Sequence, residues 1–150
     1  PYERQVLARL DELRLMDRVR WLGRLEPLAL LAWFHRADLF LFPAVNDGST
    51  FEGLGLVCLE AAASGTPVIA SAGCGAEDAV IHDVTGVLVP QGDAAALAVA
   101  IGRLADDADT RARMGRAAVA FARHLSWERL ARRLSAEYRG LVQAAGRAQG

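Results

Sequence analysis

Short apolar runs alternate along the chain with segments whose apolar residues repeat at helical spacing. The predicted strands are the runs Val19–Leu22, Leu39–Phe42, Val68–Ala70 and Val87–Val89. Strands that alternate with helices are typical of a parallel sheet, because each parallel connection needs a crossover that a helix can supply. The pattern therefore predicts an α/β fold, a Rossmann-like parallel sheet with helices on both faces.

Proline and glycine mark the ends of the crossover segments. Pro27 suits the first position of a helix, and the apolar residues that follow it recur three or four positions apart. A second helix is predicted from about Gly55 to Ser64, with Gly65 as its C-terminal cap. Pro67 blocks any continuation of that helix, so the strand Val68–Ala70 follows at once.

Three further helices are predicted in the second half of the chain. Asp93 is a good N-cap after a turn, and it precedes a helix with Leu97, Ile101 and Leu104 on one face. A helix covers about Arg111–His124, and the last one begins at Ser126. The apolar stripe of that last helix consists of Trp127, Leu130, Leu134, Tyr138, Leu141 and Val142.

The composition indicates one globular domain without the excess of positive charge that binds nucleic acid or anionic membranes. The chain has 150 residues, of which 53% are hydrophobic and 23% charged, and its formal net charge is −1. Such a balance gives no general attraction to nucleic acid, and the arginines after residue 110 are interspersed with acids, as on a solvated helix face. Trp21, Trp33 and Trp127 are expected to pack in the core or between helices.

The cysteines and histidines form no recognisable metal set. Cys58 and Cys74 are expected to be ordinary reduced thiols, and the three histidines are scattered along the chain. No apolar stretch reaches the roughly 18 residues of a membrane span. These features favour a cytoplasmic protein, with peripheral attachment to the inner face of the membrane as an alternative. The first residue is Pro1, so we expect the sequence to begin inside a longer protein.

The segment after Leu39–Phe42 carries the candidate chemistry. The strand ends at Pro43 and opens into the loop 44–51, which leads to Glu52-Gly53-Leu54-Gly55 and a helix that contains Glu60. In open α/β sheets ligands bind outside the carboxyl ends of the strands. A glycine-bearing loop that enters a helix offers free backbone N–H groups and a positive helix end, which suit a phosphate or another anion.

Two glutamates flank the start of that helix. If the intervening residues are helical, Glu52 and Glu60 are separated by about 12 Å along the axis. That distance suits the two ends of one ligand with a diphosphate between them, but not two carboxylates about 5–9.5 Å apart around one scissile bond. As an alternative, Glu52 complements the helix dipole and Glu60 simply faces solvent, as most charged residues do. The spacing, the two glycines and the preceding strand together favour the binding site.

The stretch from Glu52 to Glu60 resembles the Glu-x7-Glu signature of retaining, GT-B-fold glycosyltransferases of glycosyltransferase family 4 (glycosyl transferases group 1). The similarity extends over about Val19–Tyr138. Its further segments are His35–Pro43, Ser64–Ser71, Thr85–Asp93 and Leu125–Glu128. The resemblance implies the C-terminal half of a GT-B fold and a domain that binds a nucleotide-diphosphate sugar.

The resemblance also implies roles for individual residues. Glu52 is the implied catalytic residue, which contacts the donor sugar and stabilises the transition state, and Glu60 accepts hydrogen bonds from the ribose hydroxyls. Gly23 and Arg24 are placed near the base. The donor-binding backbone is that of Gly53, Leu54, Gly55 and Leu56. The implied reaction retains anomeric configuration and needs neither a metal nor a cofactor.

The sequence departs from the family pattern in several places. Leu54 replaces a frequent Phe, Cys74-Gly75 replaces a Gly-Gly pair, and Asp78 replaces a common Glu. The loop 44–51 is longer than in many members. The donor sugar, its base and the acceptor, whether a sugar, a lipid-linked or a small molecule, stay open.

The resemblance implies that residues 1–150 are an incomplete, N-terminally truncated domain. A family-like sheet has six strands in the order 3-2-1-4-5-6, and the chain carries sequence for the last four. The first two strands, with a diphosphate-binding Arg and Lys, and the N-terminal acceptor domain would be supplied by the same enzyme or by a separate chain.

We therefore expect the isolated 150 residues to be inactive in glycosyl transfer, and marginal or associating in solution, because unpaired backbone in a parallel sheet is costly. A transfer assay on the purified chain checks this expectation, and measurable turnover would contradict it.

Three other functions are compatible with parts of the sequence. The first is a dinucleotide oxidoreductase, because Gly53-Leu54-Gly55 begins like the dinucleotide-binding fingerprint, although that fingerprint demands an immediate strand-to-helix turn. A non-catalytic nucleotide-sugar-binding subunit of a split glycosyltransferase would be distinguished by its gene boundary. A GT-B-fold sugar-nucleotide epimerase would form product without an acceptor.

Overall fold

The computed structural model describes residues 2–48 and 52–148, with side chains through Ala145. Ser49, Thr50 and Phe51 of the predicted loop lie outside the described residues. The chain forms two compact units, residues 1–30 and residues 31–150, and each is considered by itself.

The first unit contains helix α1 (Tyr2–Glu12), turns, and the start of helix α2 (Pro27–Arg36). The predicted strand Val19–Leu22 is wrong, because these residues are not in a strand, and Val19 and Trp21 are more than 40% exposed. A strand exists through ladder hydrogen bonds to a neighbour, and the described residues of this unit contain no strand that could pair with it.

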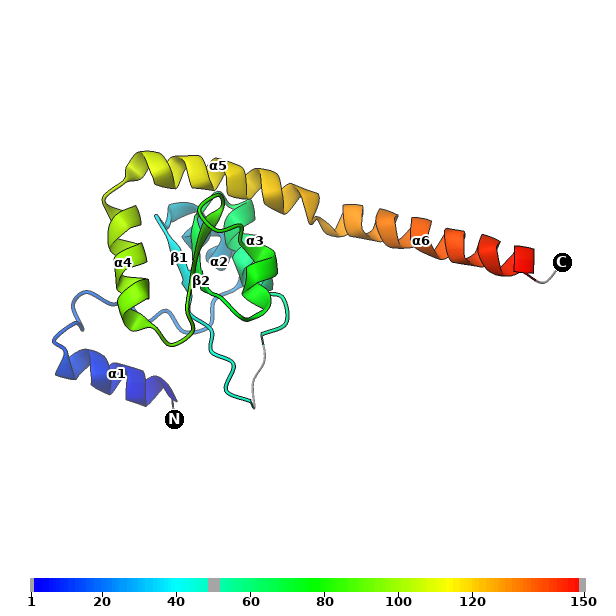
Figure 1. The fold of residues 1–150 in the computed structure, drawn as a ribbon. Coiled ribbons are helices and arrows are strands. Elements are labelled where there is room, and N and C mark those ends of the chain that lie inside the picture. The colour runs from blue at the N-terminus through cyan, green and yellow to red at the C-terminus, as the bar shows by residue number, and fades with distance from the viewer. Residues whose placement is uncertain (1, 49–51, 149–150) are drawn as a thin grey trace. The chain divides into compact units, whose positions relative to one another are not determined.

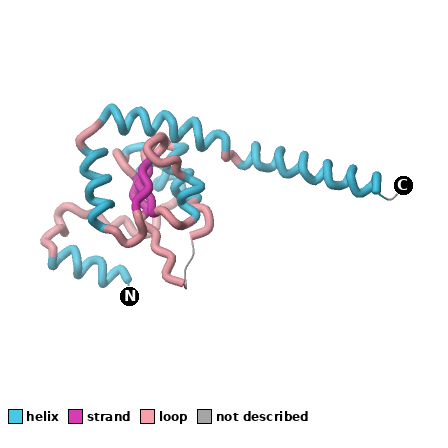
Figure 2. Tube along the Cα trace, in the orientation of Figure 1, coloured by secondary structure: helices cyan, strands magenta, loops and turns pink. Residues whose placement is uncertain are grey.

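The second unit is built on a three-stranded parallel sheet (Figures 1 and 2). Its strands, in spatial and chain order, are β1 (Phe40–Phe42), β2 (Val68–Ser71) and β3 (Gly86–Val89). Phe40 pairs with Val68, and Ile69 pairs with Val87, both in parallel register. The predicted parallel pairing is confirmed. The helical elements after β1 are α3 (Leu56–Ala63), the 3-10 helix η1 (Gly75–Ala79), α4 (Ala94–Ala105), α5 (Ala108–His124) and α6 (Trp127–Ala148).

One face of the sheet is covered by α4 and by part of α5. Because side chains alternate across a strand, Ile69, Val87 and Val89 share this face, where they form a cluster with Leu104 and Met114. Ile69 and Leu104 have no exposed surface. Full burial of side chains of this size stabilises a fold by about 1.5–3 kcal/mol each.

The opposite face packs against α2 and α3, and Figure 1 shows α3 and α4 on opposite sides of the strands. The Phe34 ring of α2 meets Phe40 edge to face, with ring centroids 5.2 Å apart. The buried hydroxyl of Thr66 donates a hydrogen bond of 2.5 Å to the carbonyl of Phe34, which ties α2 to the start of β2. Helices thus cover both faces of the sheet, as predicted.

The helix ends follow the predicted capping residues closely. Gly65 has a positive φ of 84° directly after α3, and Asp93 accepts a hydrogen bond of 2.8 Å from the Ala96 N–H at the start of α4. Helix α5 begins at Ala108, three residues before the predicted Arg111, because Asp107 accepts the Thr110 N–H at 2.9 Å and acts as its N-cap.

The three tryptophans do not pack in the core, contrary to the prediction. Trp21, Trp33 and Trp127 are 47%, 41% and 74% exposed. The predicted stripe of α6 does form on a helix, but every described side chain of α6 is exposed. A periodic apolar stripe predicts a helix, but it does not show which surface covers the stripe. Among the described residues no helix has the length and apolar character needed to cross a membrane.

Two helical glycines give a matched test of this packing. A Cβ on Gly115 of α5 would lie 2.2 Å from the carbonyl oxygen of Gly65, whereas a Cβ on Gly102 of α4 meets nothing within 4 Å. Gly115→Ala should therefore lower the free energy of unfolding by about 1–3 kcal/mol. Gly102→Ala should raise it by about 0.5–1 kcal/mol through helix propensity. Urea unfolding of both variants measures the pair, and equal effects would show that α5 does not need close contact at Gly65.

Candidate functional site

The candidate site lies where the three strands end. The chain leaves β1 at Pro43, β2 at Ala72 and β3 at Pro90, so the loops that follow them start from one edge of the sheet. The loop after β1 reaches Glu52 and enters α3 through Gly55. This is the edge at which open α/β sheets bind ligands.

The predicted distance between Glu52 and Glu60 assumed that the residues between them are helical, but α3 begins only at Leu56. Gly55 has φ 64° and ψ 49°, a left-handed conformation that suits glycine, and Leu56 is the first helical residue. The segment Glu52–Gly55 is therefore not helical, and the estimate of about 12 Å along a helix axis is wrong. The helical rise from Leu56 to Glu60 is only about 6 Å.

The carboxylate of Glu52 accepts hydrogen bonds from the backbone at the entrance to α3. Its Oε1 accepts the Gly55 N–H at 2.7 Å and the Leu54 N–H at 3.3 Å. These are two of the amides predicted to meet the donor. Glu52 thus supplies the negative charge that the start of a helix favours, and the entrance to α3 holds a carboxylate.

Glu60 lies on the outward side of the same helix. Cys58, Ala61 and Ala62 are buried on the inner side, whereas Leu56 and Glu60 are exposed. Helical Cα–Cβ bonds tilt toward the N-terminus, so the Glu60 side chain starts toward the end of α3 that follows Glu52. Within the described residues the Glu60 carboxylate has no hydrogen-bond or ion-pair partner, which leaves it available to a ligand.

The backbone of Glu52 is fixed from both sides. Its N–H donates to Asn46 Oδ1 at 3.3 Å, and its carbonyl accepts the Gly75 N–H at 2.8 Å. A Cβ on Gly75 would lie 2.1 Å from the Gly53 carbonyl carbon. In the sequence, Gly75 was noted only because Cys74-Gly75 replaces a Gly-Gly pair. In the structure, its lack of a side chain allows its backbone to contact the backbone of Gly53.

Two further residues of this edge, Asn46 and Gln91, were missed by the sequence analysis. The backbone N–H of Asn46 donates to Gln91 Oε1 at 2.8 Å, although the two residues are 45 positions apart in the sequence. The only sequence signal for them was their position in loops that follow strands.

Cys58 lies beneath this loop but is not a nucleophile. A Cβ on Gly55 would be 3.4 Å from its Sγ. Burial raises the pKa of the Cys58 thiol to about 12, and the nearby negative charge of Glu52 contributes in the same direction. The thiol is therefore protonated at neutral pH. Both cysteines are free and buried, as expected of reduced thiols.

Gly23 and Arg24 belong to the first unit, whereas both glutamates belong to the second. Gly23 has a positive φ of 63°, as a tight turn requires, although the strand predicted before it is absent. Their place near the base stays a prediction.

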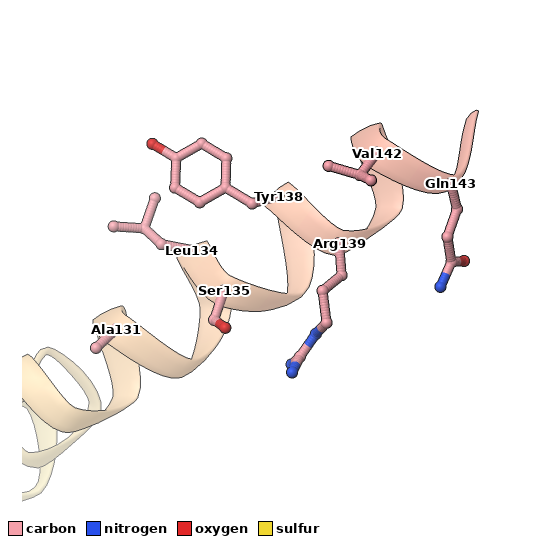
Figure 3. A pocket seen from close by; sticks show the side chains of 7 residues that line it. All are labelled: Ala131, Leu134, Ser135, Tyr138, Arg139, Val142 and Gln143. Carbon is pink, nitrogen blue, oxygen red and sulfur yellow. The ribbon is translucent and has the colours of Figure 1, made fainter. Parts of the chain in front are cut away.

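A hollow along α6 is a weaker candidate for a binding site. All of its lining residues belong to this one helix: Ala131, Leu134, Ser135, Tyr138, Arg139, Val142 and Gln143. Figure 3 shows Leu134 and Tyr138 on one side of the helix and Ser135 and Arg139 on the other, so the side chains do not converge. Ligand sites have polar groups that converge on the ligand, and the polar side chains of this hollow do not converge.

Comparisons with known proteins identify the family and the fold of the chain. The family model described as glycosyl transferases group 1 matches residues 1–121. D-inositol 3-phosphate glycosyltransferase of Corynebacterium glutamicum is 41% identical over 132 residues, which cover 88% of this chain and 30% of that protein. The chain thus spans about a third of the length of this curated relative.

Two solved structures share the fold. Sucrose-phosphate synthase from Thermosynechococcus elongatus superposes with a TM-score of 0.82 at 36% identity, over 94% of this chain and 34% of that one. Anabaena HepE in complex with UDP-glucose superposes with a TM-score of 0.73 at 28% identity, over 81% of this chain and 32% of that one.

The contact between Gly75 and Gly53 provides a test of how the loop is held. Gly75→Ala should lower the free energy of unfolding by about 1–3 kcal/mol, because the new methyl group overlaps backbone atoms. Gly53→Ala adds a methyl group with nothing within 4 Å, so it should change stability by no more than about 0.5 kcal/mol. Denaturant unfolding compares the two, and a neutral Gly75→Ala would show that the loop is not packed against η1.

Proposed function

The chain belongs to the family of glycosyl transferases group 1, and on this basis we propose that it is the donor-binding domain of a retaining glycosyltransferase of the GT4 type. It binds a nucleotide-diphosphate sugar and supports transfer of the sugar to an acceptor hydroxyl. The acceptor site would be supplied by an N-terminal domain of the same enzyme or by a separate chain.

One observation carries the proposal. Glu52 and Glu60 lie before and within α3, at the carboxyl edge of a parallel sheet, and the amides of Leu54 and Gly55 between them already bind a carboxylate. Amides that bind one anion at a helix entrance suit another, such as a diphosphate. A carboxylate on each side of that point then serves the two ends of the donor.

The solved neighbours support a nucleoside diphosphate sugar as the donor class. HepE, 28% identical over this fold, was crystallised with UDP-glucose. A UDP-sugar is therefore the first donor to test. Glu60 would accept hydrogen bonds from the ribose, Glu52 would face the sugar, and Gly23 with Arg24 would lie near the base.

Donor binding would require an exchange at the entrance to α3. The Glu52 carboxylate accepts hydrogen bonds from the Leu54 and Gly55 amides. The diphosphate, with the backbone of Gly53 and Leu56 beside it, would take over those amides. Glu52 would then turn to the hydroxyls of the sugar.

The proposed reaction is a same-face substitution. The bond between the anomeric carbon and the phosphate oxygen breaks as the acceptor oxygen attacks from the same face, and the acceptor proton passes to the departing phosphate oxygen. The Glu52 carboxylate would stabilise the positive charge that develops on the sugar ring, a contribution made mainly in the transition state. No step is assigned to a metal or a cofactor.

The alternatives have less support. Residues 43–55 separate β1 from α3, so the immediate strand-to-helix turn of a dinucleotide oxidoreductase is absent from the described chain. The relatives are named as a glycosyltransferase and a synthase, which favours a transferase over an epimerase or a non-catalytic subunit.

The two glutamates should separate binding from turnover in the complete enzyme. Loss of the charge-assisted hydrogen bonds from Glu60 should cost about 1.5–3 kcal/mol, so Glu60→Ala should weaken UDP and UDP-sugar alike by roughly 10- to 150-fold. Glu52→Ala should leave UDP affinity nearly intact, because it also frees two amides, but it should depress turnover. Calorimetry with UDP and initial transfer rates measure these effects.

Glu137→Ala is the matched control, since Glu137 is an exposed glutamate on α6. It should change neither quantity. If Glu52→Ala abolishes UDP binding while Glu60→Ala has no effect, the proposed polarity of the donor along α3 is wrong.

A further inference from the structure

Two amide side chains connect the loops that follow all three strands. Asn46 lies after β1, Gly73 after β2 and Gln91 after β3. The Asn46 N–H donates to Gln91 Oε1 at 2.8 Å, and Gln91 Nε2 donates to the Ala72 carbonyl at 2.9 Å. Gln91 thus uses its acceptor toward one loop and its donor toward another.

The side chain of Asn46 extends this connection to Glu52. Its Nδ2 donates to the Gly73 carbonyl at 3.2 Å, and its Oδ1 accepts the Glu52 N–H at 3.3 Å. We refer to Asn46 and Gln91, with these four hydrogen bonds, as the amide clasp. The clasp ends on the backbone of the residue that carries the proposed catalytic carboxylate.

Both clasp residues are half-buried, and the clasp depends on a close approach at Gly73. That residue has a positive φ of 72°, and a Cβ on it would lie 3.1 Å from Gln91 Nε2. The absence of a side chain at Gly73 leaves room for the Gln91 amide. A side-chain amide offers both a donor and an acceptor on one planar group, so an aspartate or a glutamate would keep only the acceptor half of each connection.

We propose that Asn46 and Gln91 are positioning residues that hold Glu52 at the entrance to α3. The inference rests on the proposed function of Glu52. The Gly75 N–H, at the start of η1, holds the Glu52 carbonyl. Asn46 Oδ1 holds the Glu52 N–H, and Gln91 in turn holds the backbone of Asn46. Without the clasp, the carboxylate loses the fixed backbone from which it reaches either the α3 amides or the sugar.

The test uses the complete enzyme with a UDP-sugar donor. Asn46→Ala and Gln91→Ala each remove two of the four hydrogen bonds of the clasp. Turnover should fall by about 5- to 30-fold, whereas UDP affinity, measured by calorimetry, should change less than about twofold, because neither side chain faces the ribose in the proposal. Gln91→Ala leaves Asn46 bonded to Glu52, so it tests the clasp even if Asn46→Ala fails to fold.

Conservative variants and a stability control separate positioning from general destabilisation. Gln91→Glu keeps the acceptor for the Asn46 N–H and should recover part of the turnover lost in Gln91→Ala. Asn46→Asp keeps the acceptor for the Glu52 N–H and should likewise exceed Asn46→Ala. Asp107→Ala removes the N-cap of α5, a comparable hydrogen bond outside the site. It should lower the melting temperature without lowering turnover.

A double-mutant cycle with Glu52→Gln decides whether the clasp acts through Glu52. If it does, Gln91→Ala should have little further effect on turnover in the Glu52→Gln background, since coupled residues are non-additive. Fully additive losses, or alanine variants with unchanged turnover, would overturn the inference while Glu52 keeps its role. Unchanged transfer in Glu52→Gln alone would overturn the proposed function, and with it the inference.

Discussion

The burial of β2 on both faces is the constraint on which the rest of this structure depends. All four residues Val68–Ser71 are buried, between α4 on one side and α3 on the other. Polar backbone in such a place must be paired, and the parallel ladders to β1 and β3 pair it. Parallel pairing brings the carboxyl ends of all three strands to one edge, so the loops that carry Asn46, Gly73 and Gln91 meet there. The site follows from the sheet.

Much of the fold could be predicted because its signals are local. A proline at a helix start, a glycine with positive φ at a helix end and an aspartate cap each act within a few residues, and Pro27, Gly65 and Asp93 all behave as predicted. The features that the sequence did not reveal depend on distant partners. Val19–Leu22 has strand-like composition but pairs with no strand in the part of the chain that the structure describes, and the exposure of the tryptophans depends on which surfaces cover them.

The same distinction applies within the candidate site. The spacing of Glu52 and Glu60 drew attention to the correct helix, but it did not show that α3 begins only at Leu56, because that depends on the left-handed Gly55. Nor did it show that the Glu52 carboxylate binds the Leu54 and Gly55 amides. Asn46 and Gln91 could not be predicted for a stronger reason, since their hydrogen bond links two loops that are separated in the sequence by α3, β2, η1 and β3.

The length of chain between Asn46 and Gln91 has a practical consequence for protein engineering. Chimeric enzymes are often assembled by exchanging contiguous segments, and a crossover point anywhere between Asn46 and Gln91 would take these two residues from different parents. Each parental half would fold around its own strands, yet the loops at the sheet edge would no longer match. Segment exchange in this domain should therefore transfer residues 46–91 as one block, so that the loop bearing Glu52 keeps the partners with which it folds.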